Sequence, residues 1–436
     1  MNTSKSYRSA FFTITSLFFL WGFITVLVDS LIPRLRDVFE LSYFQAGLVQ
    51  FAFFGAFFLL SIPAGFILSK IGYKKGIILG LSLMAIGCLL FYPAASYRAF
   101  SAFLLGYFTL ASGITILQVA ANPYVALLGT EEGAASRLNL SQAFNSLGTA
   151  IAPVVGAIFL LSDTVKSSEE IEMLSAADKE AYYISEASAV QMPFLFIVVF
   201  IALLVIAFAF IKLPKLIEDS PQGGYLTLIA QKPKILLGAL GIFVYVGAEV
   251  AIGSYLVNYF MHMELVDTIK ETPFMRFLSE TLLGASLEKK DGKAIVGAFV
   301  VFYWSGAMIG RFVGAYLTKI IPPGKVLGIF ATIAILMITL SISTSGLVSM
   351  WSILAVGLFN SIMFPTIFTL ALDGLEDLKA QASGILCTAI VGGAIIPPIY
   401  GLLTDHIGFK TALLLIALCY GFILYYGWSK RHKETN

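Results

Sequence analysis

The chain is a succession of apolar runs, each of about 18–28 residues, that continues from one terminus to the other. A run of this length crosses a hydrocarbon core of roughly 30 Å as an α-helix. Asp, Glu, Lys and Arg make up 12% of the 436 residues, about half of the roughly 25% typical of soluble domains. The period-2 alternation of membrane β-strands is absent from the runs. The sequence therefore predicts a multi-pass α-helical membrane protein.

The apolar runs can be delimited as twelve spans. They lie near 11–32, 44–69, 76–95, 99–128, 138–161, 192–211, 235–262, 294–318, 326–343, 349–372, 380–402 and 411–428. The first run lacks a small-residue cleavage site, so it is not interpreted as a removable signal peptide. The three cysteines lie within spans, and the three histidines lie near span ends without metal-ligand spacing. We expect neither a resident cofactor nor a metal centre.

Lys and Arg are concentrated in the loops on one side of the predicted membrane. The loop after the second span carries Lys70, Lys74 and Lys75, whereas the short loops on the opposite side together carry four basic residues, Arg34, Arg36, Arg98 and Lys410. By the positive-inside rule, this bias places both termini in the cytoplasm. The expected location is a bacterial inner membrane.

The chain repeats one pattern twice. A segment with prolines and paired glycines at 212–234 predicts a cytoplasmic linker between bundles at 1–211 and 235–436, each with six spans. Three motif pairs recur at an offset of about 245 residues. They are 65–70 with 314–319, Gln118 and Pro123 with Asn360 and Pro365, and Gly148, Pro153 and Gly156 with Gly393, Pro398 and Gly401. Two parallel six-helix pseudo-repeats around a polar cavity are the plan of the major facilitator fold.

Several segments resemble a known family. Those similar to the fucose permease family are FFLWG at 18–22, YFQAGL at 43–48, AANPY at 120–124, RLNLSQAFNS at 137–146 and PTIF at 365–368. ILQV at 116–119 and GAEVAIGSY at 247–255 are more similar to its glucose/galactose transporter branch. The resemblance covers nearly the whole chain. It implies secondary active import of a hexose together with a cation by alternating access.

Two acids within the spans, Asp29 and Glu249, are candidate cation-coupling residues. A charge at mid-bilayer costs about 2.5–3.5 kcal/mol on insertion scales, which makes a functional role the default hypothesis. The structural alternatives are a hydrogen bond between helices for Asp29 and a salt bridge to Arg311 for Glu249. Fucose permeases have a glutamate where this chain has Gln118. This exchange favours sodium, at Asp29 or Glu249, slightly over a proton.

Neutral polar side chains recur one turn apart within the spans. Amides both donate and accept hydrogen bonds without net charge, as sugar hydroxyls require, although buried amides also hold membrane helices together. We predict sugar contacts for Gln118, Asn122, Gln142, Asn145, Ser254, Asn258 and Asn360.

Four residues are predicted to serve the cytoplasmic gate or the helix geometry. Arg311 lies near the cytoplasmic end of its span, where it would brace the gate in preference to contacting sugar. Lys70 belongs to a loop with the glycines and bases of the facilitator signature, in which Ser69 replaces the usual aspartate. Pro123 and Pro365 each remove an intrahelical hydrogen bond and allow local bending.

Taken together, these features predict a monomeric sugar:cation symporter, with glucose or galactose as the hexose. The first alternative is an L-fucose or N-acetylglucosamine:proton symporter, and the second is a membrane sugar sensor that does not transport. No phosphate-binding loop, catalytic pair or basic nucleic-acid surface is found in the sequence. We therefore expect a lipid bilayer and a small sugar as partners, with no nucleic acid and no enzymatic activity.

Overall fold

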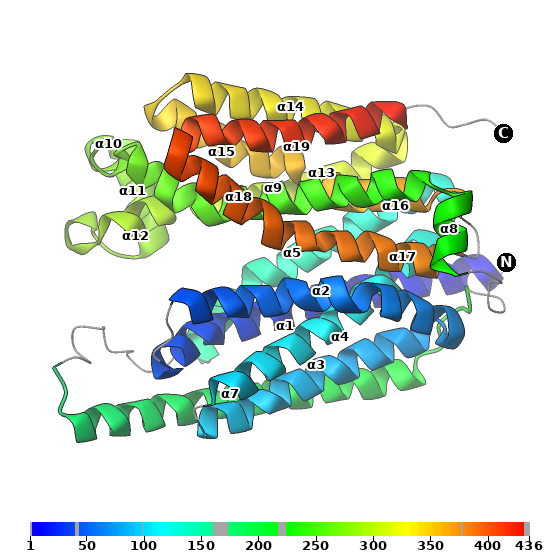
Figure 1. Cartoon of the computed structure of the whole chain (residues 1–436), viewed down its shortest axis with the longest axis horizontal. Coiled ribbons are helices and arrows are strands. Elements are labelled where there is room, and N and C mark those ends of the chain that lie inside the picture. Colours follow the sequence, from blue (N-terminus) through cyan, green and yellow to red (C-terminus); the bar gives the residue numbers. More distant parts are fainter. Residues whose placement is uncertain are drawn as a thin grey trace. The chain divides into compact units, whose positions relative to one another are not determined.

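The computed structural model describes residues 2–39, 43–97, 99–159, 173–216, 224–375 and 378–430, and these residues form helices joined by turns (Figure 1). The helices of the first half are α1 (Asn2–Phe39), α2 (Tyr43–Ile71), α3 (Tyr73–Ser96), α4 (Phe100–Leu127), the 3-10 turn η1 (Glu131–Gly133), α5 (Ala134–Phe159), α7 (Ala176–Phe210) and α8 (Tyr225–Gln231). Those of the second half are α9 (Lys234–His262), α10 (Leu265–Glu271), α11 (Pro273–Leu283), η2 (Leu287–Lys289), α12 (Gly292–Gly297), α13 (Val300–Ile320), α14 (Pro323–Ser343), α15 (Gly346–Asn360), α16 (Met363–Leu372), α17 (Lys379–Thr388), η4 (Ala389–Val391), α18 (Gly392–Ile407) and α19 (Phe409–Ser429).

Eleven helical stretches of the described residues are long and apolar enough to cross a membrane. They correspond to eleven of the twelve predicted spans. The predicted fifth span, 138–161, forms α5 but is not among them. Its polar residues Asn139, Gln142 and Asn145 lower the hydropathy of this helix. The all-helical prediction is therefore confirmed.

Some predicted boundaries differ from the observed elements. The tenth span divides into α15 and α16, and the eleventh into α17, η4 and α18. The segment 263–293, predicted as a loop, contains the short helices α10 and α11. Leu265, Ile269 and Met275 are buried in these helices, while Arg276 pairs with Glu280 at 3.2 Å on the exposed side. The apolar residues at helical spacing thus fold this segment onto the end of α9.

The chain forms two compact units. Unit 1 comprises Met1–Gly129, Phe144–Gln231 and Gly374–Thr388, and unit 2 comprises Thr130–Ala143, Lys232–Asp373 and Ala389–Asn436. Each unit therefore includes a short segment from the other half of the sequence. In unit 1 this segment carries α17, and in unit 2 it carries the first part of α5.

Within unit 1, α2 and α17 cross at two glycines. A Cβ atom on Gly65 would lie 2.8 Å from the carbonyl oxygen of Ala380 and 3.3 Å from the Cα of Gly384, so the backbones approach too closely for a larger residue. Tyr225, from the linker helix α8, donates its hydroxyl to the Ile62 carbonyl beside this crossing. Burial raises the pKa of the Tyr225 phenol, which keeps it a donor. The recurring motif at 65–70 thus marks a helix crossing.

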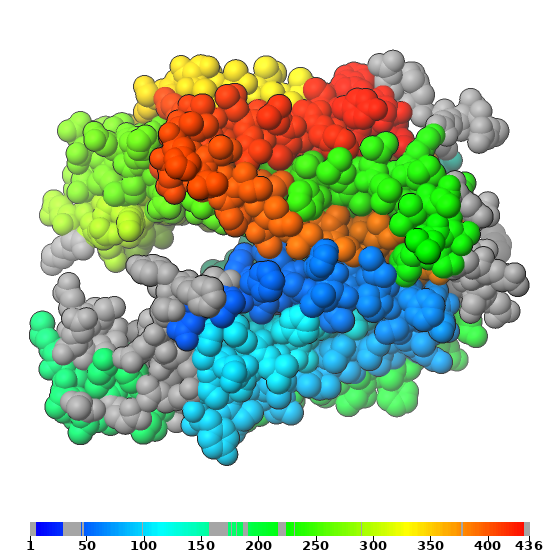
Figure 2. Space-filling view, in the orientation of Figure 1, coloured from blue at the N-terminus to red at the C-terminus, as the bar shows by residue number. Residues whose placement is uncertain are grey.

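One face of unit 2 is formed by α14, α18 and α19, drawn from yellow to red in Figure 2. Large apolar side chains of α18 and α19 are exposed, including Leu402 at 59%, Leu414 at 52% and Leu418 at 73%. An apolar surface of this kind would be unfavourable in water but matches lipid acyl chains. It agrees with the membrane setting predicted from composition.

Candidate functional site

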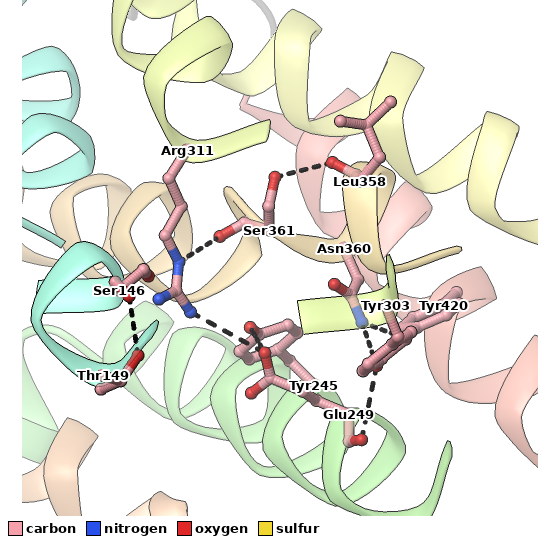
Figure 3. A network of polar contacts seen from close by, with 10 residues as sticks. All are labelled: Ser146, Thr149, Tyr245, Glu249, Tyr303, Arg311, Leu358, Asn360, Ser361 and Tyr420. Atoms are coloured by element: carbon pink, nitrogen blue, oxygen red, sulfur yellow. Dashed lines mark hydrogen bonds and ion pairs between the residues drawn. The ribbon is translucent and has the colours of Figure 1, made fainter. Parts of the chain in front are cut away.

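Glu249 is the centre of a polar network in unit 2 (Figure 3). Its carboxylate is 14% exposed and accepts a hydrogen bond of 2.6 Å from the hydroxyl of Tyr245, which lies one turn earlier on α9. Arg311, on α13, brings its Nη2 to 3.8 Å from the same Oε1 atom. An almost buried carboxylate therefore has one neutral donor and one cation at the same oxygen.

Arg311 also bonds the backbone of the tenth span. Its Nε donates to the carbonyl oxygen of Ser361 at 3.2 Å (Figure 3). Ser361 follows the last residue of α15, and its hydroxyl donates to the Leu358 carbonyl at 2.7 Å. The guanidinium, 16% exposed, thus connects α13 to the break between α15 and α16 while facing Glu249.

Asn360 lies beside this break and is fully buried. Its Nδ2 donates to the hydroxyl oxygens of Tyr303 at 2.7 Å and of Tyr420 at 3.1 Å. The Tyr303 hydroxyl donates in turn to the backbone carbonyl of Glu249 at 3.4 Å. The Oδ1 atom of Asn360 has no hydrogen-bond partner in the described part of the chain. The network therefore joins α9, α13, α15 and α19 through three side chains and one backbone carbonyl.

Two of the predicted sugar-contact residues lie on α9. Ser254 and Asn258 lie one turn apart and are both exposed, beyond Glu249 toward the C-terminal end of the helix. Their exposure leaves their hydrogen-bonding groups accessible to a ligand. The sugar contact predicted for them stays a prediction.

Two predicted amides of unit 1 lie on α4. Gln118 is half-buried, whereas Asn122 is fully buried one turn further along. Pro123 follows Asn122 and does not interrupt α4, which is helical from Phe100 to Leu127. The Ser383 hydroxyl of α17 donates to the Val119 carbonyl at 2.9 Å, next to this proline.

The predicted amides of α5 differ in their surroundings. Asn145 donates its Nδ2 to the Phe18 carbonyl of α1 at 2.9 Å, and a Cβ atom on Gly22 would lie 2.7 Å from that nitrogen. Asn145 therefore already holds two helices together, which was the structural alternative for buried amides. Gln142, one turn earlier on the same helix, is 7% exposed. The sugar contact predicted for both stays a prediction.

Lys70 and Asp29 complete the predicted residues. Lys70 lies in the last turn of α2, and its Nζ lies 4.1 Å from the ring centroid of Phe66, a cation–π distance within its own helix. Ser69, in place of the usual aspartate, bonds the Phe66 carbonyl at 2.8 Å. Asp29 belongs to α1, but its side chain lies outside the described residues.

Four residues that bond in these networks were not predicted from the sequence: Tyr245, Tyr303, Tyr420 and Ser383. The position of Tyr245, four residues before Glu249, signals a shared helix face. Tyr420 and Ser383 carry no signal in their own segments, because their partners come from distant helices.

No group of three or more His, Cys, Asp or Glu side chains gathers into a metal site among the residues whose placement is described. The three cysteines are buried and free. A cation at Glu249 would have the carboxylate and the Tyr245 hydroxyl as nearby oxygen donors, with Arg311 as a competing charge.

Comparisons with known proteins agree on one family. The model described as Major Facilitator Superfamily matches residues 9–390. A glucose/galactose transporter of Brucella abortus is 48% identical over 432 residues, which cover 98% of this chain and 95% of the relative. A putative glucose/galactose transporter of Helicobacter pylori is 42% identical, covering 97% of each chain. An L-fucose-proton symporter of Escherichia coli is 35% identical, covering 99% of this chain and 95% of the relative.

Among solved structures, a transporter of the same superfamily, FucP in the outward conformation, matches with a TM-score of 0.86 and 33% identity. The match covers 98% of this chain and 100% of that one. The sequence identities follow the order expected from the motifs, with glucose/galactose transporters above the L-fucose symporter. The resemblance read from the sequence motifs is therefore confirmed.

Proposed function

The chain belongs to the major facilitator superfamily, and from this premise we propose that it imports a hexose together with a cation by alternating access. The observation that carries the proposal is the Glu249–Arg311 pair within an apolar helix bundle. A carboxylate that alternates between a fixed cation and a mobile one can couple the movement of that cation to the movement of a second solute.

Glucose or galactose is the proposed sugar. The relatives named glucose/galactose transporters, at 48% and 42% identity, support this choice. The proposed contacts are the amides of α4 and α5 together with Ser254, Asn258 and Asn360. Of these, Gln118 is half-buried, and Ser254 and Asn258 are exposed, so their polar groups are accessible to sugar hydroxyls.

The ion is proposed to be sodium or a proton, with support for each. The relative named an L-fucose-proton symporter supports the proton. Arg311, at 3.8 Å, also opposes a second full positive charge beside Glu249, whereas protonation only neutralises the carboxylate. Sodium is favoured by Gln118, which replaces the family's span-4 glutamate, and Asp29 provides a second candidate acid.

The alternative cargo is L-fucose or N-acetylglucosamine with a proton, supported for L-fucose by the 35% identical relative. A sensor without transport is a further alternative, but the match to 95% and 97% of the length of relatives named transporters favours transport. The proposed setting is the bacterial inner membrane, with both termini in the cytoplasm and the protein as a monomer.

Uptake of labelled sugars into proteoliposomes tests the proposal. Glucose, galactose, L-fucose and N-acetylglucosamine are offered under a sodium gradient at fixed pH, and under a pH gradient without sodium. The wild type is expected to accumulate glucose or galactose under one gradient, which identifies the ion.

Glu249→Gln should lower the accumulation ratio by roughly 5–150-fold, the range of typical coupling free energies. Sugar exchange without a gradient should persist, because exchange needs no net cation movement. Glu271→Gln, which changes an exposed acid of α10, is the control and should accumulate sugar like the wild type. Wild-type accumulation by Glu249→Gln would refute the coupling role.

A further inference from the structure

Pro365 leaves one backbone carbonyl of the tenth span without its helical donor. In an α-helix the N–H of each residue donates to the carbonyl four residues earlier, and proline has no N–H. The acceptor that loses its partner is the carbonyl of Ser361. The next residue restores the pattern, since the Thr366 N–H donates to the Ile362 carbonyl at 3.0 Å. The helical pattern therefore resumes directly after the proline.

Arg311 occupies that oxygen. Its Nε donates to the Ser361 carbonyl at 3.2 Å, and this bond restrains the direction of the rigid guanidinium. In that orientation, Nη2 lies 3.8 Å from Oε1 of Glu249 (Figure 3). The position of the positive charge beside the carboxylate thus depends on a carbonyl that is available because residue 365 is proline.

The corresponding proline of unit 1 has a different donor. Pro123 leaves the Val119 carbonyl without its helical donor, and the Ser383 hydroxyl bonds that oxygen at 2.9 Å. Both prolines leave the carbonyl four residues earlier without its helical donor, but the partner in unit 1 is neutral. The two prolines therefore allow the effect of a charged donor to be compared with that of a neutral donor within one chain.

We propose that Pro365 is a positioning residue for cation coupling, because the carbonyl it frees holds Arg311 against Glu249. Arg311 then competes with the coupling cation for the carboxylate, which lowers the cation affinity and allows release. This inference rests on the proposed function and adds to it the element that sets the strength of the competition.

The substitution Pro365→Ala tests the proposal. Ser361 and Ile362 already have helical backbone angles, with φ −52° and ψ −41° and with φ −86° and ψ −7°, so an alanine N–H at 365 can donate to the Ser361 carbonyl. Arg311 would lose its bond to the Ser361 carbonyl. The cation concentration that gives half-maximal sugar uptake should fall about tenfold, as expected when an opposing charge moves away.

Pro123→Ala is the matched control, since it restores an N–H at the equivalent place without affecting a charge. Its maximal rate can change, but the half-saturating cation concentration should stay within about twofold. In an Arg311→Gln background, Pro365→Ala should cause no further change in the half-saturating cation concentration. Equal shifts in the two proline variants, or an undiminished shift without Arg311, would overturn the proposal.

A measurement without transport separates this proposal from the proposed function. A double-mutant cycle of Arg311→Gln and Glu249→Gln, followed by thermal unfolding, measures the energetic coupling between the two side chains. The coupling should fall by about half or more in the Pro365→Ala background. An unchanged coupling refutes the positioning role even if transport is cation-driven, and a reduced coupling supports it even if the cargo is not a hexose.

Should Pro365→Ala fail to fold, Arg311→Lys provides the second test. Lysine keeps the charge but has no planar group that can bond the Ser361 carbonyl and face Glu249 at the same time. Arg311→Lys should therefore lower the cation concentration that gives half-maximal sugar uptake, as expected of Pro365→Ala. A wild-type cation dependence in Arg311→Lys would contradict the proposal.

Discussion

The prolines of the fourth and tenth spans show how one backbone defect acquires two roles. Each proline follows an amide by five residues, Gln118 before Pro123 and Asn360 before Pro365. In unit 1 the helix α4 continues through its proline. In unit 2 the helix stops after Asn360 and resumes at Met363. The repeat preserves the defect, and its surroundings decide whether the helix breaks.

The donors to the two freed carbonyls differ in charge. Ser383 supplies a hydroxyl from α17 in unit 1, whereas Arg311 supplies a guanidinium from α13 in unit 2. A hydroxyl stabilises packing, but a guanidinium also brings a full charge to within reach of Glu249. The difference teaches that an internal repeat can keep the spacing of amide and proline while the backbone and the chemistry around it diverge, so equivalent positions need not share a function.

The largest effect is expected from Arg311→Met, which removes the charge that distinguishes the donor of unit 2 from the donor of unit 1. The substitution leaves the Glu249 carboxylate without its cation and the Ser361 carbonyl without its donor. Breaking such a buried pair costs about 3–5 kcal/mol of unfolding free energy. Thermal unfolding of the purified protein in detergent should show a large fall in Tm.

The double variant Arg311→Met with Glu249→Gln should recover part of this loss, because no unpaired charge remains. If the single variant is no less stable than Ser383→Ala, charge does not distinguish the two proline sites. The proposed difference between the units, a neutral donor in unit 1 and a charged donor in unit 2, would then have no effect on stability.

A smaller effect should distinguish Asn360 from Gln118, the amides that precede the two prolines. Asn360→Leu removes the donor shared by the hydroxyl oxygens of Tyr303 and Tyr420 and should cost about 1–3 kcal/mol of unfolding free energy. Gln118→Leu, at the equivalent half-buried position, should change stability by less than about 0.5 kcal/mol. Its KM for sugar should instead rise about tenfold, as for one lost hydrogen bond.

Unfolding and uptake kinetics, measured on the same preparations, check both expectations. A raised KM with unchanged Tm in Asn360→Leu would place this amide with Gln118 in the sugar site. Equal destabilisation of the two variants would mean that the amides share a structural role in both units.

The sequence alone predicted the helices and the order of the spans, because hydropathy and proline spacing are local properties. It also identified Glu249 and Arg311 as possible partners, since a charge in an apolar span needs compensation. It did not predict the breaks in the tenth and eleventh spans. The same spacing of amide and proline accompanies a continuous helix in unit 1 and a broken one in unit 2.

The contacts between distant helices were beyond prediction. Tyr420 bonds a residue 60 positions away, and Ser383 bonds one 264 positions away. Helical periodicity tells which face of a helix carries a residue, but it does not tell which side chain of another helix lies opposite. Asp29 was predicted from its charge, and its side chain lies outside the described residues, so its coupling role stays a prediction.

The smallest effect is expected from Ser383→Ala, and it tests whether the freed carbonyl of unit 1 matters at all. Loss of the hydroxyl leaves the Val119 carbonyl without a donor from α17, which should cost about 1 kcal/mol of unfolding free energy. In a Pro123→Ala background the alanine N–H can bond that carbonyl, so the same substitution should cost less than about 0.5 kcal/mol. Thermal unfolding of the four proteins of this cycle measures the difference. If Ser383→Ala costs the same in both backgrounds, its bond does not depend on the proline, and the two prolines do not act through their freed carbonyls in the same way.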